Sequence, residues 1–108
     1  MVERLDRPIS GHAVHIAIYK WKDDAPIDRL EEAMDKLRGM ADDVPGMRLI
    51  TWGRNTNKWA EGFTHAILIL GDDETAIEQY RAHPLHKDVA EFIDLWEGFG
   101  VGVDFKKD

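Results

Sequence analysis

Residues 63–70 read Phe-Thr-His-Ala-Ile-Leu-Ile-Leu, and their β-branched and aliphatic side chains predict a β-strand. Apolar side chains occupy both faces of that strand: Phe63, Ile67 and Ile69 on one, and Ala66, Leu68 and Leu70 on the other. An antiparallel sheet usually has one dry and one wet face, so its strands alternate apolar and polar residues. Because this strand does not alternate, we expect both of its faces to be covered.

The stretch 12–22, His-Ala-Val-His-Ile-Ala-Ile-Tyr-Lys-Trp-Lys, predicts a second strand with the same property. Its two faces carry Ala17, Tyr19 and Trp21, and Val14, Ile16 and Ile18. Two helices cover only one face of a four-stranded sheet. A second copy of the same sheet is the simplest cover for the other face. We therefore expect a homodimer.

An amphipathic helix is predicted after the first of these strands, because apolar residues recur there at steps of three and four: Ile27, Leu30, Met34 and Leu37. Asp23 and Asp24 offer a capping carboxylate, and Pro26 suits the first turn. The helix should end within 39–43, before the turn signal Val44-Pro45-Gly46.

The remaining segments complete a regular order. Residues 47–55 predict a strand, 74–80 a short helix, and 83–96 a further helix that begins at His83-Pro84. In 101–105, Val, Val and Phe alternate with Gly and Asp, which predicts the last strand. The order is β-α-β-β-α-β. The expected fold is therefore α+β and ferredoxin-like, a four-stranded antiparallel sheet with helices on one face.

Length and composition narrow the classes of protein. The 108 residues accommodate one domain, expected over 12–108 after a flexible N-terminal arm of residues 1–11. The net charge of −7 argues against nucleic acid and anionic membranes as partners. Cysteine is absent, which excludes disulfides and thiolate chemistry. No apolar run marks a signal peptide or a membrane span, so a cytoplasmic location is the default expectation.

Five short stretches, in order along the chain, resemble the motifs of one family. They are 15–22 (His-Ile-Ala-Ile-Tyr-Lys-Trp-Lys), 44–47 with 52–55 (Val-Pro-Gly-Met and Trp-Gly-Arg-Asn), 62–65 (Gly-Phe-Thr-His), 80–86 (Tyr-Arg-Ala-His-Pro-Leu-His) and 103–105 (Val-Asp-Phe). The family is the stress-responsive dimeric α/β-barrel (Dabb) domain, and the resemblance covers nearly the whole domain. It implies a dimer in which two four-stranded sheets close into a barrel. Most members have no assigned reaction, and some plant members are stress-responsive.

The side chains that suit chemistry are four histidines and a tyrosine: His15, His65, His83, His86 and Tyr80. Histidine exchanges protons near neutral pH, and tyrosine can donate a hydrogen bond to a developing enolate or alkoxide. This set therefore favours proton transfer, as in an enolisation or an aldol closure. If the relevant strand faces look toward the helices, His15 and His65 would line one cavity between sheet and helices.

The resemblance gives these residues individual roles. One plant member, olivetolic acid cyclase, closes a linear polyketide thioester by an intramolecular aldol reaction without a cofactor. By similarity to it, Tyr80 and His86 occupy catalytic positions, while His15 and His65 occupy pocket positions on the strands. His83 matches the family's His-Pro position and is taken as a further substrate-binding candidate that also shapes the helix start. A small-molecule ligand is expected, with no cofactor and no metal.

Other interpretations stay open beside this one. The histidines of a non-catalytic stress-responsive or ligand-binding protein would only satisfy hydrogen bonds in the core. Zinc could use His83, His86 and a strand histidine, although no fourth ligand is evident. Cofactor-free oxygenases share the fold but not these motifs. Arg81, Lys87 and Asp88 also replace residues that are aliphatic, small or apolar in the cyclase. An enzyme with these charges should act on a smaller or more polar substrate.

Overall fold

The computed structural model describes residues 12–107. Its elements are β1 (His12–Trp21), α1 (Ile27–Arg38), the 3₁₀ helix η2 (Gly39–Asp42), β2 (Met47–Arg54), β3 (His65–Gly71), α2 (Glu74–Ala82), α3 (Pro84–Trp96) and β4 (Glu97–Lys107). The predicted N-terminal arm, residues 1–11, lies outside the described residues. None of the helices within 12–107 combines the length and apolar composition that crossing a membrane requires.

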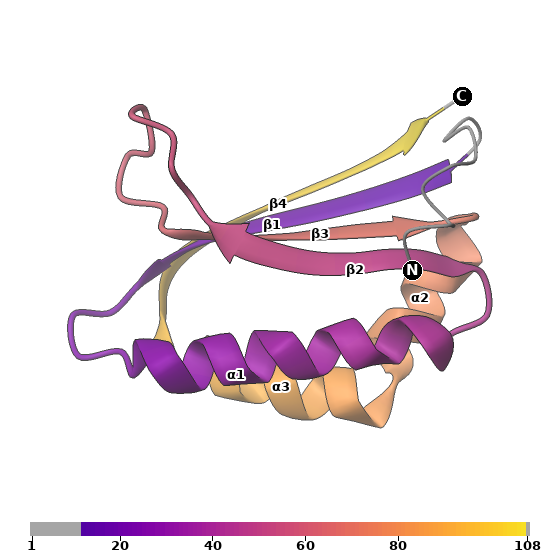
Figure 1. Ribbon diagram of the computed structural model, residues 1–108, viewed down its shortest axis with the longest axis horizontal. Helices are drawn as coiled ribbons and strands as arrows, with labels where there is room; N and C mark the ends of the chain where they lie inside the picture. Colours follow the sequence, from indigo (N-terminus) through magenta and orange to yellow (C-terminus); the bar gives the residue numbers. More distant parts are fainter. Residues whose placement is uncertain (1–11, 108) are drawn as a thin grey trace.

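The four strands form one antiparallel sheet in the order β2-β3-β1-β4. The helices lie together on one side of that sheet, and within residues 12–107 no helix covers the other side (Figure 1). This arrangement confirms the ferredoxin-like α+β prediction. The second helical segment is divided into α2 and α3, as the break at His83-Pro84 suggested.

The last strand is longer than the prediction of 101–105. β4 starts directly after α3 and pairs with β1 from the His12–Lys107 pair to the Trp21–Glu97 pair. Backbone hydrogen bonds to the full length of β1 extend it through glycines that disfavour a strand in isolation. The predicted turn at 44–46 is confirmed, and Gly46 has a positive φ of 79°, a conformation that glycine adopts without strain.

The predicted capping of the first helix by Asp23 or Asp24 is wrong. Pro26 is the N-cap of α1, and no side chain makes a cap hydrogen bond there. The Ala25 N–H instead donates to the Lys22 carbonyl oxygen at 3.0 Å and closes a turn over the two aspartates. The helix therefore starts beyond the reach of either carboxylate.

The core lies between the sheet and the helices. Its most deeply buried side chains come from α1, η2, β2 and β3: Leu30, Met34, Met40, Ile50 and Ile69. This packing orients one face of β1 and β3 toward α1 and α3. The alternating residues of that face therefore meet the helices, and they include His15, Tyr19 and His65.

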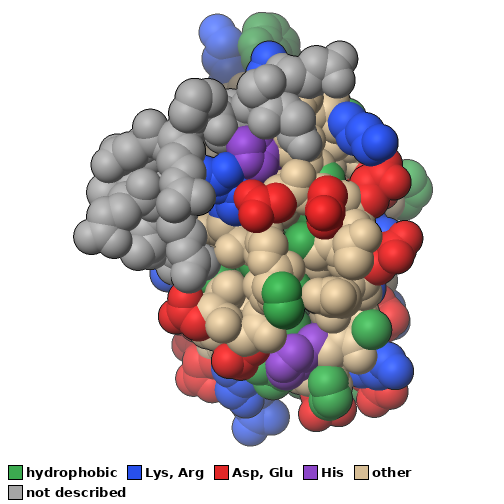
Figure 2. Space-filling view, turned by 90° about the vertical axis from the view of Figure 1, so that its right-hand side faces the viewer, with side chains coloured by type: hydrophobic (Ala, Val, Ile, Leu, Met, Phe, Trp, Pro, Cys, Tyr) green, Lys and Arg blue, Asp and Glu red, His purple; other side chains and the backbone are tan. Residues whose placement is uncertain are grey.

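The opposite face of the sheet is apolar, as predicted for β1 and β3. β4 extends it, because Val101, Val103 and Phe105 pair with Ile18, Ile16 and Val14 of β1. In the single chain, Phe99, Val101, Val103 and Phe105 remain 38–56% exposed. The end of the molecule that carries α2 is different: Figure 2 shows acidic and basic side chains mixed there with only small, separate hydrophobic groups.

Candidate active site between the sheet and the helices

A small cavity of about 60 Å³ lies between β1, β3 and the helices. Its lining includes three of the predicted site residues, His15, Tyr80 and His86, together with Tyr19, and these side chains come from β1, α2 and α3. Apolar residues such as Leu37, Ile67, Val89 and Ile93 form much of the rest of the wall. Space of this size admits water or a very small molecule.

Tyr80 and His86 are brought together by the junction of α2 and α3. Tyr80 lies in the last turns of α2 and His86 in the first turn of α3. Between them, His83 has an extended backbone with φ −64° and ψ 135°, which turns the chain from one helix into the next. The two rings meet edge to face, with centroids 4.5 Å apart and an interplanar angle of 63°.

Burial sets the protonation state of His86. Removal from water lowers the pKa of its imidazole below the ordinary value, because the charged form loses most on desolvation; the nearby backbone of Arg81 acts in the opposite direction. His86 is therefore neutral at pH 7. Its Nδ1 is buried and has no hydrogen-bond partner among the described residues. A neutral imidazole with an unpartnered nitrogen beside a cavity can accept a proton.

The two tyrosines keep their protons for the same physical reason. Burial, followed by the nearby Tyr19, raises the pKa of Tyr80 well above its usual range. Burial, with smaller effects from Glu97 and Asp94, raises the pKa of Tyr19 to about 12. Each hydroxyl is therefore available as a hydrogen-bond donor at any pH near neutrality.

His15 belongs to a polar cluster with Asp104 and Arg81. Its Nδ1 lies 2.5 Å from Oδ1 of Asp104, and Nη2 of Arg81 donates to both carboxylate oxygens at 3.3 and 3.4 Å. The hydrogen bond from His15 is the main reason that the pKa of Asp104 is lowered. An imidazole that donates from Nδ1 presents Nε2 as an acceptor, so Asp104 sets the tautomer of His15.

Sequence reasoning missed the roles of Asp104 and Arg81 in this cluster. The signal for Asp104 was present, because it is the acidic residue in the otherwise apolar and glycine positions of 101–105. Arg81 stood out only as a departure from the cyclase. Nothing in the sequence places either beside His15, which is 89 positions from Asp104 along the chain.

His65 faces the helices, as expected, but is not among the residues that line the cavity. It is only 3% exposed, and both ring nitrogens are engaged. Nδ1 lies 2.9 Å from the donor Nε1 of Trp21 and 2.8 Å from Oγ1 of Thr64, while Nε2 lies 2.8 Å from a Glu31 oxygen. The rings of Trp21 and Trp52 both lie near the imidazole, at centroid distances of 5.7 and 6.0 Å.

Glu31 connects His65 to α1. Its carboxylate also accepts two hydrogen bonds from Arg54, at 2.6 and 2.7 Å. These bonds, with Arg54 contributing most and His65 next, lower the pKa of Glu31 to about 2. The arrangement ties β3 and β2 to α1 through the Glu31 carboxylate, which stays charged near neutral pH.

His83 also lies away from the cavity lining. It is the N-cap of α3, where its Nδ1 accepts a hydrogen bond of 3.1 Å from the Leu85 backbone N–H, and Pro84 follows in the first turn. The residue thus satisfies one of the free amide groups of the helix start. Residues 12–107 contain no group of three or more histidine, aspartate or glutamate side chains placed to hold a metal ion.

The family model described as "Stress responsive A/B Barrel Domain" matches residues 13–106. An Arabidopsis thaliana protein named as stress-response A/B barrel domain-containing is 23% identical over 90 residues, which cover 82% of this chain and 80% of the relative.

Two solved structures illustrate the similarity of fold. A dimeric ferredoxin-like protein of unknown function from a Jannaschia species has a TM-score of 0.78 and 24% identity, covering 88% of this chain and 98% of its own. A hydroxynitrile lyase from Passiflora edulis has a TM-score of 0.76 and 16% identity, covering 94% of this chain and 96% of its own. At these identities the likeness concerns the fold alone.

Proposed function

The chain belongs to the stress-responsive A/B barrel (Dabb) family, and from that premise we propose that it is a homodimer that binds a small molecule and catalyses cofactor-independent proton transfer on it. The observation that carries the proposal is the pairing of Tyr80 with a neutral His86 at the cavity. His15, oriented by Asp104, is the proposed substrate-binding histidine. His65 and His83 are not part of the proposed site, because neither lines the cavity and both make hydrogen bonds within the protein.

The proposed step is removal of a proton from a carbon next to a carbonyl group. His86 accepts the proton, the C–H electron pair moves into the new C=C bond, and the carbonyl oxygen takes up negative charge. The Tyr80 hydroxyl donates a hydrogen bond to that oxygen. His86 then returns a proton to the carbon, or the enolate carbon attacks a second carbonyl in an aldol closure.

Cavity size supports a small reacting group. Pockets for drug-sized ligands are commonly about 300–1,000 Å³, whereas this cavity is about 60 Å³. It fits the reacting end of a short oxo compound and leaves no room for a long hydrocarbon tail. The charge of Arg81 next to His15 also suits a polar substrate. Polyketide cyclisation is therefore not the reaction that we propose.

The dimer is supported by the uncovered face of the sheet. Phe99, Val101, Val103 and Phe105 form an apolar surface on β4 that continues across β1 and β3. Contiguous apolar surface of this kind marks an interaction site in a water-soluble domain. Solved structures with this fold include several described as dimeric ferredoxin-like proteins.

A non-catalytic role is the second candidate, and the cavity volume favours it. A space of about 60 Å³ is also what a core with slightly imperfect packing leaves. In that case the histidines would stabilise the fold, as the contacts of His65 and His83 do, and the protein would be a non-catalytic stress-responsive or ligand-binding protein.

Hydrogen–deuterium exchange on small ketones distinguishes the two candidates. In D₂O at pH 7, the purified protein should accelerate loss of the methyl proton signal of pyruvate or pyruvamide, followed by NMR, above the rate in buffer alone. His86→Gln and Tyr80→Phe should each lower the acceleration about 100-fold. The control is Arg29→Gln on the exposed side of α1, which should leave it unchanged.

Thermal melting of each variant separates lost chemistry from lost folding. Acceleration that survives in both His86→Gln and Tyr80→Phe would assign the chemistry elsewhere and overturn the proposal. Absence of any acceleration with both probes would favour the non-catalytic candidate.

A further inference from the structure

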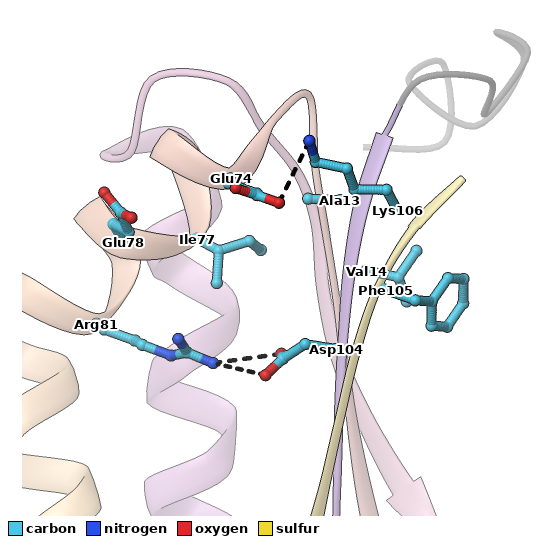
Figure 3. Close-up of a pocket in the computed structure, with 9 residues that line it drawn as sticks. All are labelled: Ala13, Val14, Glu74, Ile77, Glu78, Arg81, Asp104, Phe105 and Lys106. Atoms are coloured by element: carbon cyan, nitrogen blue, oxygen red, sulfur yellow. Dashed lines mark hydrogen bonds and ion pairs between the residues drawn. The ribbon is translucent and has the colours of Figure 1, made fainter. Parts of the chain in front are cut away.

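A second, more open cleft adjoins the cavity at the His15–Asp104 contact. It has a volume of about 250 Å³ and lies between α2 and the paired strands β1 and β4. Figure 3 shows Arg81 reaching from α2 across the cleft toward Asp104 on β4, with Lys106 and Glu74 closing its other end. His15 lines the cavity, while its hydrogen-bond partner Asp104 lines the cleft. A molecule bound in the cleft beside Asp104 thus lies close to His15.

Arg81 is only partly engaged by Asp104. Both of its contacts use the same nitrogen, Nη2, at 3.3 and 3.4 Å. A well-formed guanidinium–carboxylate pair uses two nitrogens at about 2.7–2.9 Å. His15 Nδ1 lies 2.5 Å from Asp104 Oδ1, so Asp104 is bound more closely by His15 than by Arg81. Among the described residues, Nε and Nη1 of Arg81 have no hydrogen-bond partner.

The charges around the cleft leave Arg81 as the group available to an anion. Lys106 and Glu74 form an ion pair with each other at 3.4 Å. Asp104 is shared between His15 and Arg81. Glu78 also borders the cleft, but in Figure 3 its carboxylate points away from Arg81 and Asp104. Arg81 is roughly half exposed, with a relative side-chain exposure of 47%, so a ligand can reach it from solvent.

We infer that the small molecule bound at this site carries a carboxylate, which the Arg81 guanidinium holds in the cleft. The inference rests on the proposed function for the identity of the reacting cavity. Arg81 Nη2 lies 3.3 Å from His15 Nδ1, so a carboxylate bound by the Arg81 guanidinium would lie close to His15. The inferred ligand is a short 2-oxo acid, whose carboxylate meets Arg81 and whose carbonyl end is directed toward the cavity that His15 lines. In this arrangement Arg81 is a specificity-determining residue.

The test compares pyruvate with pyruvamide, a neutral probe of nearly the same shape. Dissociation constants come from ¹H–¹⁵N NMR titrations of the full-length protein at pH 7 and low salt. The wild type should bind pyruvate at least tenfold more tightly than pyruvamide. Arg81→Gln should bring the two constants together by weakening pyruvate alone. Arg81→Lys should restore part of the preference, because it keeps the charge but loses the planar fork.

The matched control is Arg29→Gln, which removes an exposed arginine from α1, away from the cleft. It should keep the pyruvate preference. Equal affinities in the wild type, or a preference that persists in Arg81→Gln, would overturn the inference. A preference that depends on Arg81 without any methyl-proton exchange supports the carboxylate site and contradicts the catalytic proposal. Exchange that is equal for both probes and insensitive to Arg81→Gln supports the catalytic proposal and contradicts the carboxylate site.

Discussion

Single residues of the site owe their properties to burial. His86 was identified from the sequence with Tyr80, but its neutral state follows from the desolvation that only the packed helices impose. The tautomer of His15 likewise depends on a contact that only the folded chain makes, the hydrogen bond with Asp104 of β4. Residue types and their spacing predicted which groups could transfer protons. They contained no information on which ring nitrogen each partner would use.

The direction of the His86 shift gives a pH prediction. Because the folded-state pKa lies below the unfolded value of about 6.5, proton uptake by His86 favours unfolding. Its contribution to stability is present above about pH 6.5 and is lost as the pH falls toward the folded pKa. The proposed exchange reaction should be constant near neutral pH and decline once His86 is protonated.

An NMR titration of the His86 ring protons tests this directly. Its midpoint in the native protein should lie below that of the same histidine in urea-unfolded protein. Tyr80→Phe is a useful comparison, since it keeps His86 buried and should keep the low midpoint. A native midpoint at or above the unfolded one would remove the neutral base from the proposed mechanism.

At the scale of elements, the contacts of His65 join β3 to α1 and β1. The periodicity of residues 27–37 predicted the apolar face of α1, and the geometry of a strand over 63–70 placed His65 on the same face as Ile67 and Ile69. The link itself required the tertiary structure, because Glu31 reaches the imidazole from α1 and Trp21 reaches it from β1. Sequence spacing does not report which polar groups meet across a helix–sheet interface.

Replacement of His65 by alanine should destabilise the fold. The change leaves the part-buried Trp21 N–H without its acceptor and removes a buried ring that contacts the rings of Trp21 and Trp52. Loss of a buried partner costs about 1–3 kcal/mol, which corresponds to a fall in melting temperature of roughly 5–20 °C in a domain of this size. Differential scanning calorimetry measures it.

Lys58→Ala, in the exposed loop between β2 and β3, provides the reference and should change the melting temperature little. If His65→Ala melts together with that reference, the hydrogen bonds around His65 do not stabilise the fold. His65 would then return as a candidate for substrate binding.

For the whole molecule, the main feature is the apolar face of the sheet, which remains exposed to solvent in a single chain. Light scattering should give about twice the 12.4 kDa chain mass for the purified protein. Val103→Glu places a charge in the middle of the apolar surface on β4, and burying it unpaired in an interface would cost several kcal/mol. This variant should therefore scatter as a monomer.

Leu95→Glu is the matched control, because Leu95 is an exposed apolar residue of α3, on the helical side of the sheet. It should remain dimeric. A wild-type protein that is monomeric at micromolar concentration, or a dimeric Val103→Glu variant, would show that another surface or no surface mediates association.

The sequence by itself determined the order of the elements, the apolar character of both sheet faces and the set of proton-transfer residues. These depend on local periodicity and on residue type, which are properties of neighbouring positions along the chain. The tertiary structure alone decided the extent of β4, the start of α1 and the separation of His65 and His83 from the cavity. It also decided the meeting of Arg81, Asp104 and His15. Each of these depends on which distant segments share a boundary, and that is fixed by packing of the whole domain.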